Sequence, residues 1–400
     1  MMRFLSKEYD VLICGAGPAG LYAAFSLQKR APGRFKVAIV DRKSPWKEPV
    51  SCAEAVSQRI LARYWKPNEY WIRQHLNGVF FTSPDGTRVG FQQKECGYIL
   101  DRAKFHHEIA DAVASLGVEC DFSSEVIHLS RSDDSLWNVK LRSGDEECGL
   151  KAKVVIDATG PGSKITRGVP GLETLESGNF DLEPAIFAIA EGIPHDVHHI
   201  ELLFGHKYFP GGYGWVFPRD GKTVNVGLVN ARQYLRTYPP RETLLKFIAD
   251  SYPEAKILSV HGGGIPCGQS FRPLAALGVF KAGDAASTVN PISRSGIIEA
   301  MKSGKIAGES AVDWLASELE EERRDIEDSI RTHWMEVQGK SHLGLARAKD
   351  GFASIKDSQF DRAAHKLASI PIEKRSLFRI FFSVLSSSPS IFWKMRSFFI

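Results

Sequence analysis

The sequence predicts an α/β fold in which a doubly wound, Rossmann-like parallel sheet is interleaved with a second domain built on an antiparallel sheet. Residues 9–30 read as a strand, a glycine loop and a helix, and two further apolar strands, within 151–167 and 278–287, end in small residues. Alternating strands across 184–230 account for the antiparallel sheet. Because the carboxyl ends of parallel strands share one edge of a sheet, the three small-residue segments are expected to meet at one crevice.

The first segment, "YDVLICGAGPAGLYAAFSLQKR" (9–30), carries the pattern G-x-G-x-x-G between a buried strand and a helix. Gly15 permits the tight turn, Gly17 lets a pyrophosphate approach the backbone, and Gly20 lets the helix pack closely on the strand. A second strand ends at Asp41, an acid suited to ribose hydroxyls. A glycine loop also serves packing alone, but the order strand, loop, helix, strand and acid favours dinucleotide binding.

Three later positions belong to the same expected crevice. Arg102 opens a helix within 98–119, either as a solvated first-turn residue or as a ligand for phosphate or adenosine. The strand before residue 158 breaks at Thr-Gly-Pro-Gly, which contains Gly160, and the strand after residue 277 stops at Gly283-Asp284.

The composition excludes several classes of function. A net charge of +4 in 400 residues is too small to indicate nucleic-acid binding. The six cysteines include no C-x-x-C pair, so neither a metal site nor a disulfide framework is expected. Because the chain shows neither a secretory signal nor a run of about 18 apolar residues, a cytoplasmic protein without a membrane span is expected.

The three loops together resemble the flavoprotein class built like para-hydroxybenzoate hydroxylase, in which all three contact one FAD. The resemblance implies that Asp284 holds the ribityl hydroxyls or the pyrophosphate, and that the helix starting near 296–298 points at the pyrimidine edge of the flavin. The positive end of that helix would stabilise an anionic reduced flavin. The alternative is that Asp284 simply caps a helix.

Three stretches narrow the resemblance to the geranylgeranyl reductase family: "GGYGWVFP" (211–218), "SCAEAVS" (51–57) and "GDAASTVNPISRSGIIEAMKSG" (283–304). They are similar to the family's Y-x-W-x-F-P pattern, its cysteine-containing segment after the first βαβ unit and its distal glycine-aspartate signature. The resemblance runs from about residue 9 to residue 310 and is weaker beyond. It implies an FAD-dependent oxidoreductase.

The resemblance and the residue patterns together give the expected site. The expected cofactor-binding residues are Gly15, Gly17, Ala19, Gly20, Asp41, Arg42, Cys52, Ala53, Arg102, Gly160, Gly283, Asp284, Gly296 and Ile297. The expected catalytic residues are Cys52, Glu54, Tyr213 and Trp215. The expected substrate-contacting residues are Tyr213, Trp215, Phe217, Pro291 and Arg294.

Two departures from the family pattern bear on function. Serines stand at 287, 293 and 295 where the family has glycines, and Arg294 stands where small residues are usual, so the loop is suited to a charged substrate head or to a different docking of the flavin. The central loop reads "DATGPGS" (157–163) where an Asp-Gly pair associated with NAD(P)H use is commoner. The electron donor, NAD(P)H or a ferredoxin, is therefore left open.

The implied reaction adds two hydrogens across an isolated double bond of a prenyl chain, attached to a lipid, diphosphate, quinone or chlorophyll-like head. An unactivated alkene needs early protonation, which Cys52 or Glu54 would supply, while Tyr213 and Trp215 provide aromatic faces for cationic character. Taken singly, an aromatic stripe is usually core and a lone cysteine a small buried hydrophobe. An aromatic hydroxylase or halogenase is the alternative enzyme, and a non-catalytic flavin-binding or electron-carrying module the alternative outside enzymes.

The expected domains interleave along the chain. The FAD-binding domain is expected over 1–75, 98–175 and 268–320, the substrate domain over 76–97 and 176–267, and a helical region over 321–400. Residues 377–400 are rich in phenylalanine with only basic charges, which favours peripheral contact with anionic lipid over packing on the protein body. The expected partners are thus an apolar prenyl chain, an electron-donor protein and a membrane surface, without nucleic acid.

Overall fold

The computed structural model describes residues 7–47, 50–161, 163–172, 182–268 and 274–375. The chain folds into two units. The first consists of residues 1–50, 102–181 and 266–343, and the second of residues 51–101, 182–265 and 344–400. The basic, aromatic segment 377–400 lies outside the described residues, so its expected membrane contact stays a prediction.

The boundaries of the units differ from the expected ones, and the expected C-terminal region 321–400 is divided between the two units. Residues 51–75 fall in the second unit, because β3 (Ala55–Ser57) and β4 (Ile72–Thr82) both pair with β5 (Arg88–Leu100) in its sheet. Residues 321–343 fall in the first unit. There Glu327, on α6 (Glu320–Trp334), accepts hydrogen bonds from the Trp314 indole and the Gly278 amide.

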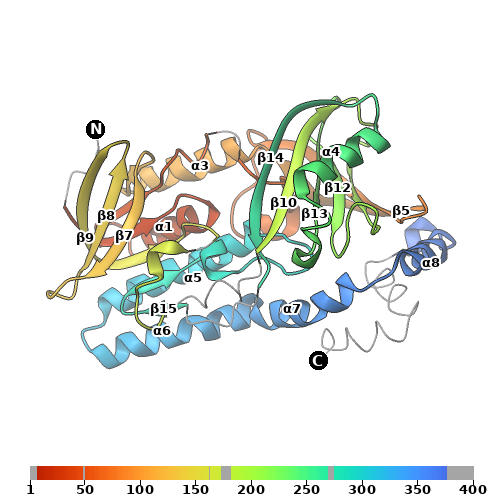
Figure 1. The fold of residues 1–400 in the computed structure, drawn as a ribbon. Helices are drawn as coiled ribbons and strands as arrows, with labels where there is room; N and C mark the ends of the chain where they lie inside the picture. Colours follow the sequence, from red (N-terminus) through yellow and green to blue (C-terminus); the bar gives the residue numbers. More distant parts are fainter. Residues whose placement is uncertain (1–6, 48–49, 162, 173–181, 269–273, 376–400) are drawn as a thin grey trace. The chain divides into compact units, whose positions relative to one another are not determined.

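The first unit is built on a parallel sheet with the strand order β16-β9-β1-β2-β6. Its strands are β1 (Glu8–Cys14), β2 (Val37–Val40), β6 (Glu119–Asp121), β9 (Glu146–Asp157) and β16 (Val279–Lys281), with the short β15 (Ala275–Ala276) antiparallel at one edge. The helices α1 (Pro18–Arg30), α3 (Arg102–Ser115) and α5 (Ile297–Ala316) belong to this unit (Figure 1). Nearly continuous burial of β1, β2 and β16 is typical of a parallel sheet covered on both faces.

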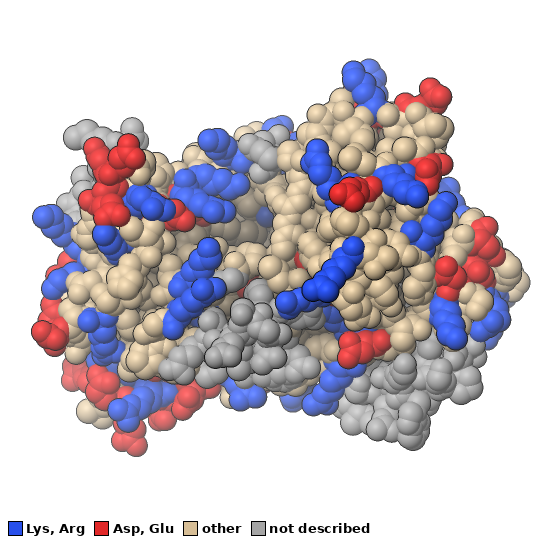
Figure 2. Space-filling model, in the orientation of Figure 1, with Lys and Arg blue, Asp and Glu red and all other residues tan. Residues whose placement is uncertain are grey.

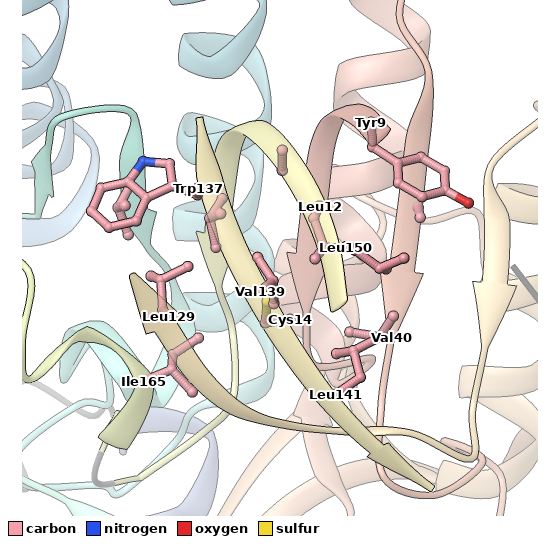
Figure 3. Close-up of a cluster of buried hydrophobic side chains, with 14 of the residues drawn as sticks. Tyr9, Leu12, Cys14, Val40, Leu129, Trp137, Val139, Leu141, Leu150 and Ile165 are labelled. Atoms are coloured by element: carbon pink, nitrogen blue, oxygen red, sulfur yellow. The ribbon is translucent and has the colours of Figure 1, made fainter. Parts of the chain in front are cut away.

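An antiparallel ribbon covers part of this sheet. The strands β7 (Glu125–Arg131) and β8 (Trp137–Ser143) pair in turn with the first half of the long β9. Side chains from this ribbon and from β1 and β2 form one apolar cluster, which includes Trp137, Leu129, Ile165 and Cys14 (Figure 3). The Trp137 indole donates a hydrogen bond to the Leu277 carbonyl, so its one polar atom is satisfied in the core.

Helices α1 and α5 pack with almost no space between their backbones. A Cβ atom on Gly304 would lie 2.2 Å from the Ala19 carbonyl oxygen, and one on Gly308 would lie 2.3 Å from the Ala23 carbonyl oxygen. Small residues four apart therefore form the contact face of α5. This contact fixes the start of α1, and with it the first glycine loop, against the helix that follows the distal loop.

The second unit is built on an eight-stranded mixed sheet with the order β14-β10-β13-β12-β11-β4-β5-β3. The strands not yet given are β10 (Leu182–Glu191), β11 (His199–Leu203), β12 (Tyr213–Pro218), β13 (Thr223–Val229) and β14 (Lys256–Pro266). Its helices are α2 (Gln58–Leu61), α4 (Pro240–Ser251) and α8 (Asp357–Ala368), while α7 (Lys340–Ala353) spans the boundary between the units.

The two faces of this second sheet carry different side chains. On one face, Val216 and Val226 pack with Leu244 and Phe247 of α4. On the other face, Trp215 and Phe217 pack with residues of the neighbouring strands and with Ala53 and Ala55. Because side chains alternate along a strand, the residues 213, 215 and 217 of β12 share this second face.

The surface gives two further observations. On the face shown in Figure 2, lysine and arginine are interspersed with aspartate and glutamate. Among the described helices, none is both long enough and apolar enough to cross a bilayer.

Candidate functional site

Four strand ends of the first unit stand side by side. Cys14 at the end of β1 is in register with Val40 of β2 and with Asp157 of β9, and Asp157 is in register with Lys281 of β16. The segments that leave these ends carry Gly15, Asp41, Gly160 and Gly283. The predicted loops therefore start from one edge of one sheet, as a doubly wound fold requires.

The three glycines of the first loop have different surroundings. Gly15 has φ +108, and a Cβ there would lie 2.2 Å from the Ala158 carbonyl oxygen. A Cβ on Gly20 would lie 1.8 Å from the Gly15 carbonyl oxygen, whereas a Cβ on Gly17 would meet no atom within 4 Å. Gly15 and Gly20 are thus required by packing, and Gly17 borders open space at the N-cap of α1.

This open space suits the phosphates of a dinucleotide. The N-cap of α1 is Gly17, which has no side chain to cap the helix, so the amides that follow Pro18 in the first turn can face an anion. Gly160 of the central loop also borders open space, with φ +87. A cradle without side chains at two adjacent strand ends fits FAD, and we take these residues as the ones that would hold it.

Asp41 and Arg42 follow β2. The Asp41 carboxylate accepts hydrogen bonds from the Ala16 amide (2.7 Å) and the Lys43 amide (3.2 Å). Asp41 therefore braces the glycine loop through one oxygen and keeps acceptor capacity on both, since each carboxylate oxygen has two lone pairs. Arg42 is exposed.

Asp284 lies in the short turn 283–286 of the distal loop. Burial raises the pKa of its carboxyl to about 6, and the charge of Arg102 acts in the opposite direction. Within the described part of the chain, no hydrogen bond reaches this carboxylate, and the N-cap of α5 is Gly296. Asp284 is thus not a cap of α5, and its geometry fits a ligand hydroxyl as the missing partner.

Arg102 is buried at the start of α3, beside a histidine that the sequence analysis did not single out. Its Nη2 lies 2.8 Å from Nε2 of His106, whose Nδ1 lies 2.9 Å from the Pro45 carbonyl oxygen. A guanidinium only donates and a carbonyl only accepts, so His106 is neutral, with its proton on Nδ1. Burial, with the nearby Arg102 charge, lowers the pKa of His106 to about 3. The i, i+4 spacing on one helix was the available signal.

The central loop is held by Asp157. Its carboxylate accepts hydrogen bonds from the Thr159 amide and hydroxyl and from the Ser163 hydroxyl, while Thr166 lies 3.3 Å away. The aspartate of "DATGPGS" is fully buried and is used to shape the loop that carries Gly160. Its carboxylate is committed within the protein.

The distal loop that precedes α5 is braced partly by hydrogen bonds within the loop. The Asn290 side chain accepts hydrogen bonds from the Ile292 and Ser293 amides, and the Arg294 guanidinium donates to the Ile292 carbonyl oxygen at 2.6 Å. Arg294 has φ +57 and is buried, as is Pro291. The loop thus holds a buried charge immediately before the N-terminus of α5, where Ile297 begins the helix.

In the second unit, the expected aromatic residues lie along β12. The ring centroids of Tyr213 and Trp215 are 6.2 Å apart, as are those of Trp215 and Phe217. Trp215 and Phe217 are buried in an apolar cluster, and Tyr213 is half-buried at its edge. A Cβ on Gly227 would lie 2.3 Å from the Trp215 ring, so this glycine makes room for the indole.

The cysteine segment lies on the same sheet. Glu54 has φ +72, a backbone conformation costing about 1–2 kcal/mol for a residue with a side chain. The Glu54 amide lies 3.2 Å from Cys52 Sγ. The Glu54 carboxylate accepts hydrogen bonds from Arg219 Nε at 2.9 Å and from Arg219 Nη2 at 3.1 Å. A bidentate pair of this kind favours the ionised carboxylate. Arg219, which the sequence analysis did not select, directly follows the Y-x-W-x-F-P pattern.

The predicted site residues thus fall into two groups. Cys52, Ala53, Glu54, Tyr213, Trp215 and Phe217 belong to the second unit, and all the others belong to the first. Within the described ranges, no group of three or more histidine, cysteine, aspartate or glutamate side chains is placed to hold a metal ion.

Comparison with known proteins gives consistent relatives along the whole chain. Residues 181–265 match the family model described as the geranylgeranyl reductase catalytic domain. The chain is 31% identical to a digeranylgeranylglycerophospholipid reductase of Methanosarcina acetivorans, with 98% of this chain and 96% of that one covered. It is 29% identical to the enzyme of the same name from Methanosarcina mazei, with 99% and 97% covered.

Solved structures share the fold. A geranylgeranyl bacteriochlorophyll reductase-like protein from Thermoplasma acidophilum superposes with a TM-score of 0.87 at 23% identity, covering 98% of this chain and 99% of that one. A flavin-dependent brominase superposes with a TM-score of 0.70 at 18% identity, covering 98% and 93%. At these identities the superpositions establish the α/β flavoprotein fold alone.

Proposed function

This chain belongs to the geranylgeranyl reductase family, and we propose that it saturates the prenyl chains of a digeranylgeranylglycerophospholipid-type lipid. It is an FAD-dependent oxidoreductase. The observation that carries the proposed substrate is the similarity over nearly the full length to reductases named for this lipid. The aromatic cluster of the second sheet supports it through Tyr213, which is half-buried at the edge of the cluster and so can border an apolar chain.

Bound FAD supplies the hydride for such a reduction. We assign its phosphates to the open backbone at Gly17 and its polar chain to Asp284 and Arg102. Asp284, being mostly ionised above pH 6, accepts hydroxyl hydrogen bonds at neutral pH. Gly296 and Ile297 present the N-terminus of α5, whose dipole stabilises negative charge.

The second unit is proposed to bind the prenyl chain and to hold the proton. Tyr213 and Trp215 offer ring faces to the positive charge that develops on carbon as an isolated alkene is protonated. The thiol of Cys52 is proposed as the proton donor. Glu54 is the weaker candidate for that role, because its carboxylate is paired with Arg219.

The test uses the FAD-loaded protein without oxygen. After reduction with dithionite, vesicles containing digeranylgeranylglycerophospholipid should restore the absorbance of oxidised flavin and yield lipid heavier by one H2 per reduced bond. Vesicles of the fully saturated lipid are the control. NAD(P)H and a reduced ferredoxin, supplied separately in place of dithionite, distinguish the two proposed reductants.

The alternative enzyme is an aromatic hydroxylase or halogenase, which rests on distant structural neighbours only. If no prenyl lipid reoxidises the flavin, while a phenol drives rapid consumption of NAD(P)H and oxygen, the reductase proposal is wrong and a hydroxylase takes its place.

A further inference from the structure

A buried asparagine joins two of the residues assigned to the reaction. Asn225 lies on β13 and is fully buried. Its Oδ1 accepts the indole N–H of Trp215 at 2.9 Å, and its Nδ2 donates to the Cys52 carbonyl oxygen at 2.9 Å. One amide therefore connects the aromatic strand to the cysteine segment, which lies more than 150 residues earlier in the chain.

The orientation of this amide is unambiguous. An indole N–H only donates and a backbone carbonyl only accepts, so exchanging the oxygen and nitrogen of Asn225 would break both hydrogen bonds. Both polar ends of the side chain are satisfied, as burial in an apolar cluster demands. An apolar residue at this strand position would form neither of these hydrogen bonds.

The cysteine segment is fixed at its other end as well. Arg219 holds the Glu54 carboxylate through two hydrogen bonds, and the Glu54 backbone adopts a left-handed conformation. Backbone in such a conformation persists only where the surroundings hold it, and it is concentrated at functional sites. Between these two anchors the Glu54 amide donates a hydrogen bond to Cys52 Sγ.

We infer that Asn225 is a positioning residue for the Cys52 thiol. By holding the Cys52 carbonyl oxygen, Asn225 fixes the backbone from which the thiol projects and sets its position relative to the Trp215 ring. Asn225 itself neither donates nor receives the reacting proton. This inference rests on the proposed function, because Cys52 matters as a proton donor only in that reaction.

The test compares two buried asparagines of the second unit, one on β13 and one directly after it. Asn225→Leu removes both hydrogen bonds, and Asn225→Asp, assayed at a pH where its carboxyl group is ionised, keeps the acceptor for Trp215 but loses the donor to Cys52. The matched control is Asn230→Leu, because Asn230 is also fully buried and donates from Nδ2 to the Tyr208 carbonyl oxygen at 3.1 Å.

Two readouts are measured on the FAD-loaded protein, together with the unfolding midpoint. The first is turnover of the lipid, where a 1 Å displacement costs up to about 100-fold. We expect kcat to fall about 10- to 100-fold in both Asn225 variants, with KM nearly unchanged. The second is alkylation of Cys52 by iodoacetamide without substrate, followed by peptide mass spectrometry, with the half-buried Cys96 and Cys148 as internal references.

The outcomes distinguish the positioning role of Asn225 from the proposed reduction of a prenyl lipid. A several-fold change in alkylation of Cys52 in both Asn225 variants, absent in Asn230→Leu, supports positioning. If the Cys52 rate is unchanged, or changes in proportion to stability in all three variants, Asn225 is only a core residue. If alkylation responds as expected but the parent protein reduces no prenyl lipid, the positioning inference stands and the proposed substrate is wrong.

Discussion

Gly17 and Gly20 lie in one loop, but their replacement by alanine should have different effects on the stability of the apoprotein and on FAD binding. A Cβ on Gly17 meets no protein atom within 4 Å, and its φ of −71 suits any residue. Gly17→Ala should therefore leave the apoprotein as stable as the parent, or more stable by about 0.4–1 kcal/mol through the lower entropy of the unfolded chain. A Cβ on Gly20 lies 1.8 Å from the Gly15 carbonyl oxygen, so Gly20→Ala should destabilise it by about 1–3 kcal/mol.

The affinity for FAD should change differently from the stability, because Gly17→Ala should weaken FAD binding without destabilising the fold. If the pyrophosphate lies against the Gly17 backbone, the added methyl group occupies its space. A steric cost of about 1–3 kcal/mol corresponds to a roughly 5- to 150-fold higher Kd. Gly17→Ala should therefore lose most of its FAD while folding normally, which unfolding by urea and flavin fluorescence titration measure on the same sample.

Gly168→Ala provides the control, because Gly168 lies in the same unit and a Cβ there also meets nothing within 4 Å. It should change the stability as Gly17→Ala does, by about 0–1 kcal/mol, and leave the affinity for FAD unchanged. If Gly17→Ala binds FAD as tightly as the parent, the open space at this loop is not where the phosphates lie, and the assignment of the cofactor to this edge of the sheet fails.

Three further predictions concern the same unit. Because the pKa of Asp284 is raised to about 6 in the folded protein, the folded state holds this proton more tightly than the unfolded chain does, and the stability of the apoprotein should fall as the pH rises from about 4 to 6. Asp284→Asn should abolish that fall in urea titrations. If the pH profile of the variant equals that of the parent, Asp284 is solvated. His106→Phe removes the acceptor for Arg102, a bond to a charged group worth about 1.5–3 kcal/mol, and should weaken FAD binding, whereas the parent affinity should show no titration of His106 between pH 5 and 8. Gly304→Ala places a Cβ 2.2 Å from the Ala19 carbonyl oxygen and should lower the free energy of unfolding by about 1–3 kcal/mol; a neutral result would mean that α1 and α5 separate readily.

Much of the fold followed from local pattern. The strand, glycine loop, helix and second strand over 9–41 were predicted from apolar runs and glycines, because the same residues that make a βαβ unit also mark its order in the chain. The α/β fold class and the family, recognised from the motifs, are confirmed by the relatives found along the whole chain. The roles of the individual site residues stay predictions.

The contacts that hold the site residues in place could not be predicted from the local sequence pattern. Nothing in the sequence near Asn225 marks it as the partner of Cys52, and nothing near Gly304 marks it as the contact of Ala19, because both pairs form between segments distant in the chain. The sequence likewise gave no sign that residues 51–75 would join the second sheet, since strand pairing depends on which edges remain open after the rest has folded.

The residue types determine which chemical groups the side chains carry, but they do not determine the environment of those groups in the folded protein. The sequence alone identifies the acid at 284, the thiol at 52 and the aromatic rings on β12. It also identifies the glycines, which have no side chain to cover the backbone. Whether a carboxylate has no hydrogen bond from the described residues, as at Asp284, or is paired with an arginine, as at Glu54, depends on neighbours brought together by folding. Burial and pairing set the charge and the orientation of a group, and both arise only in three dimensions.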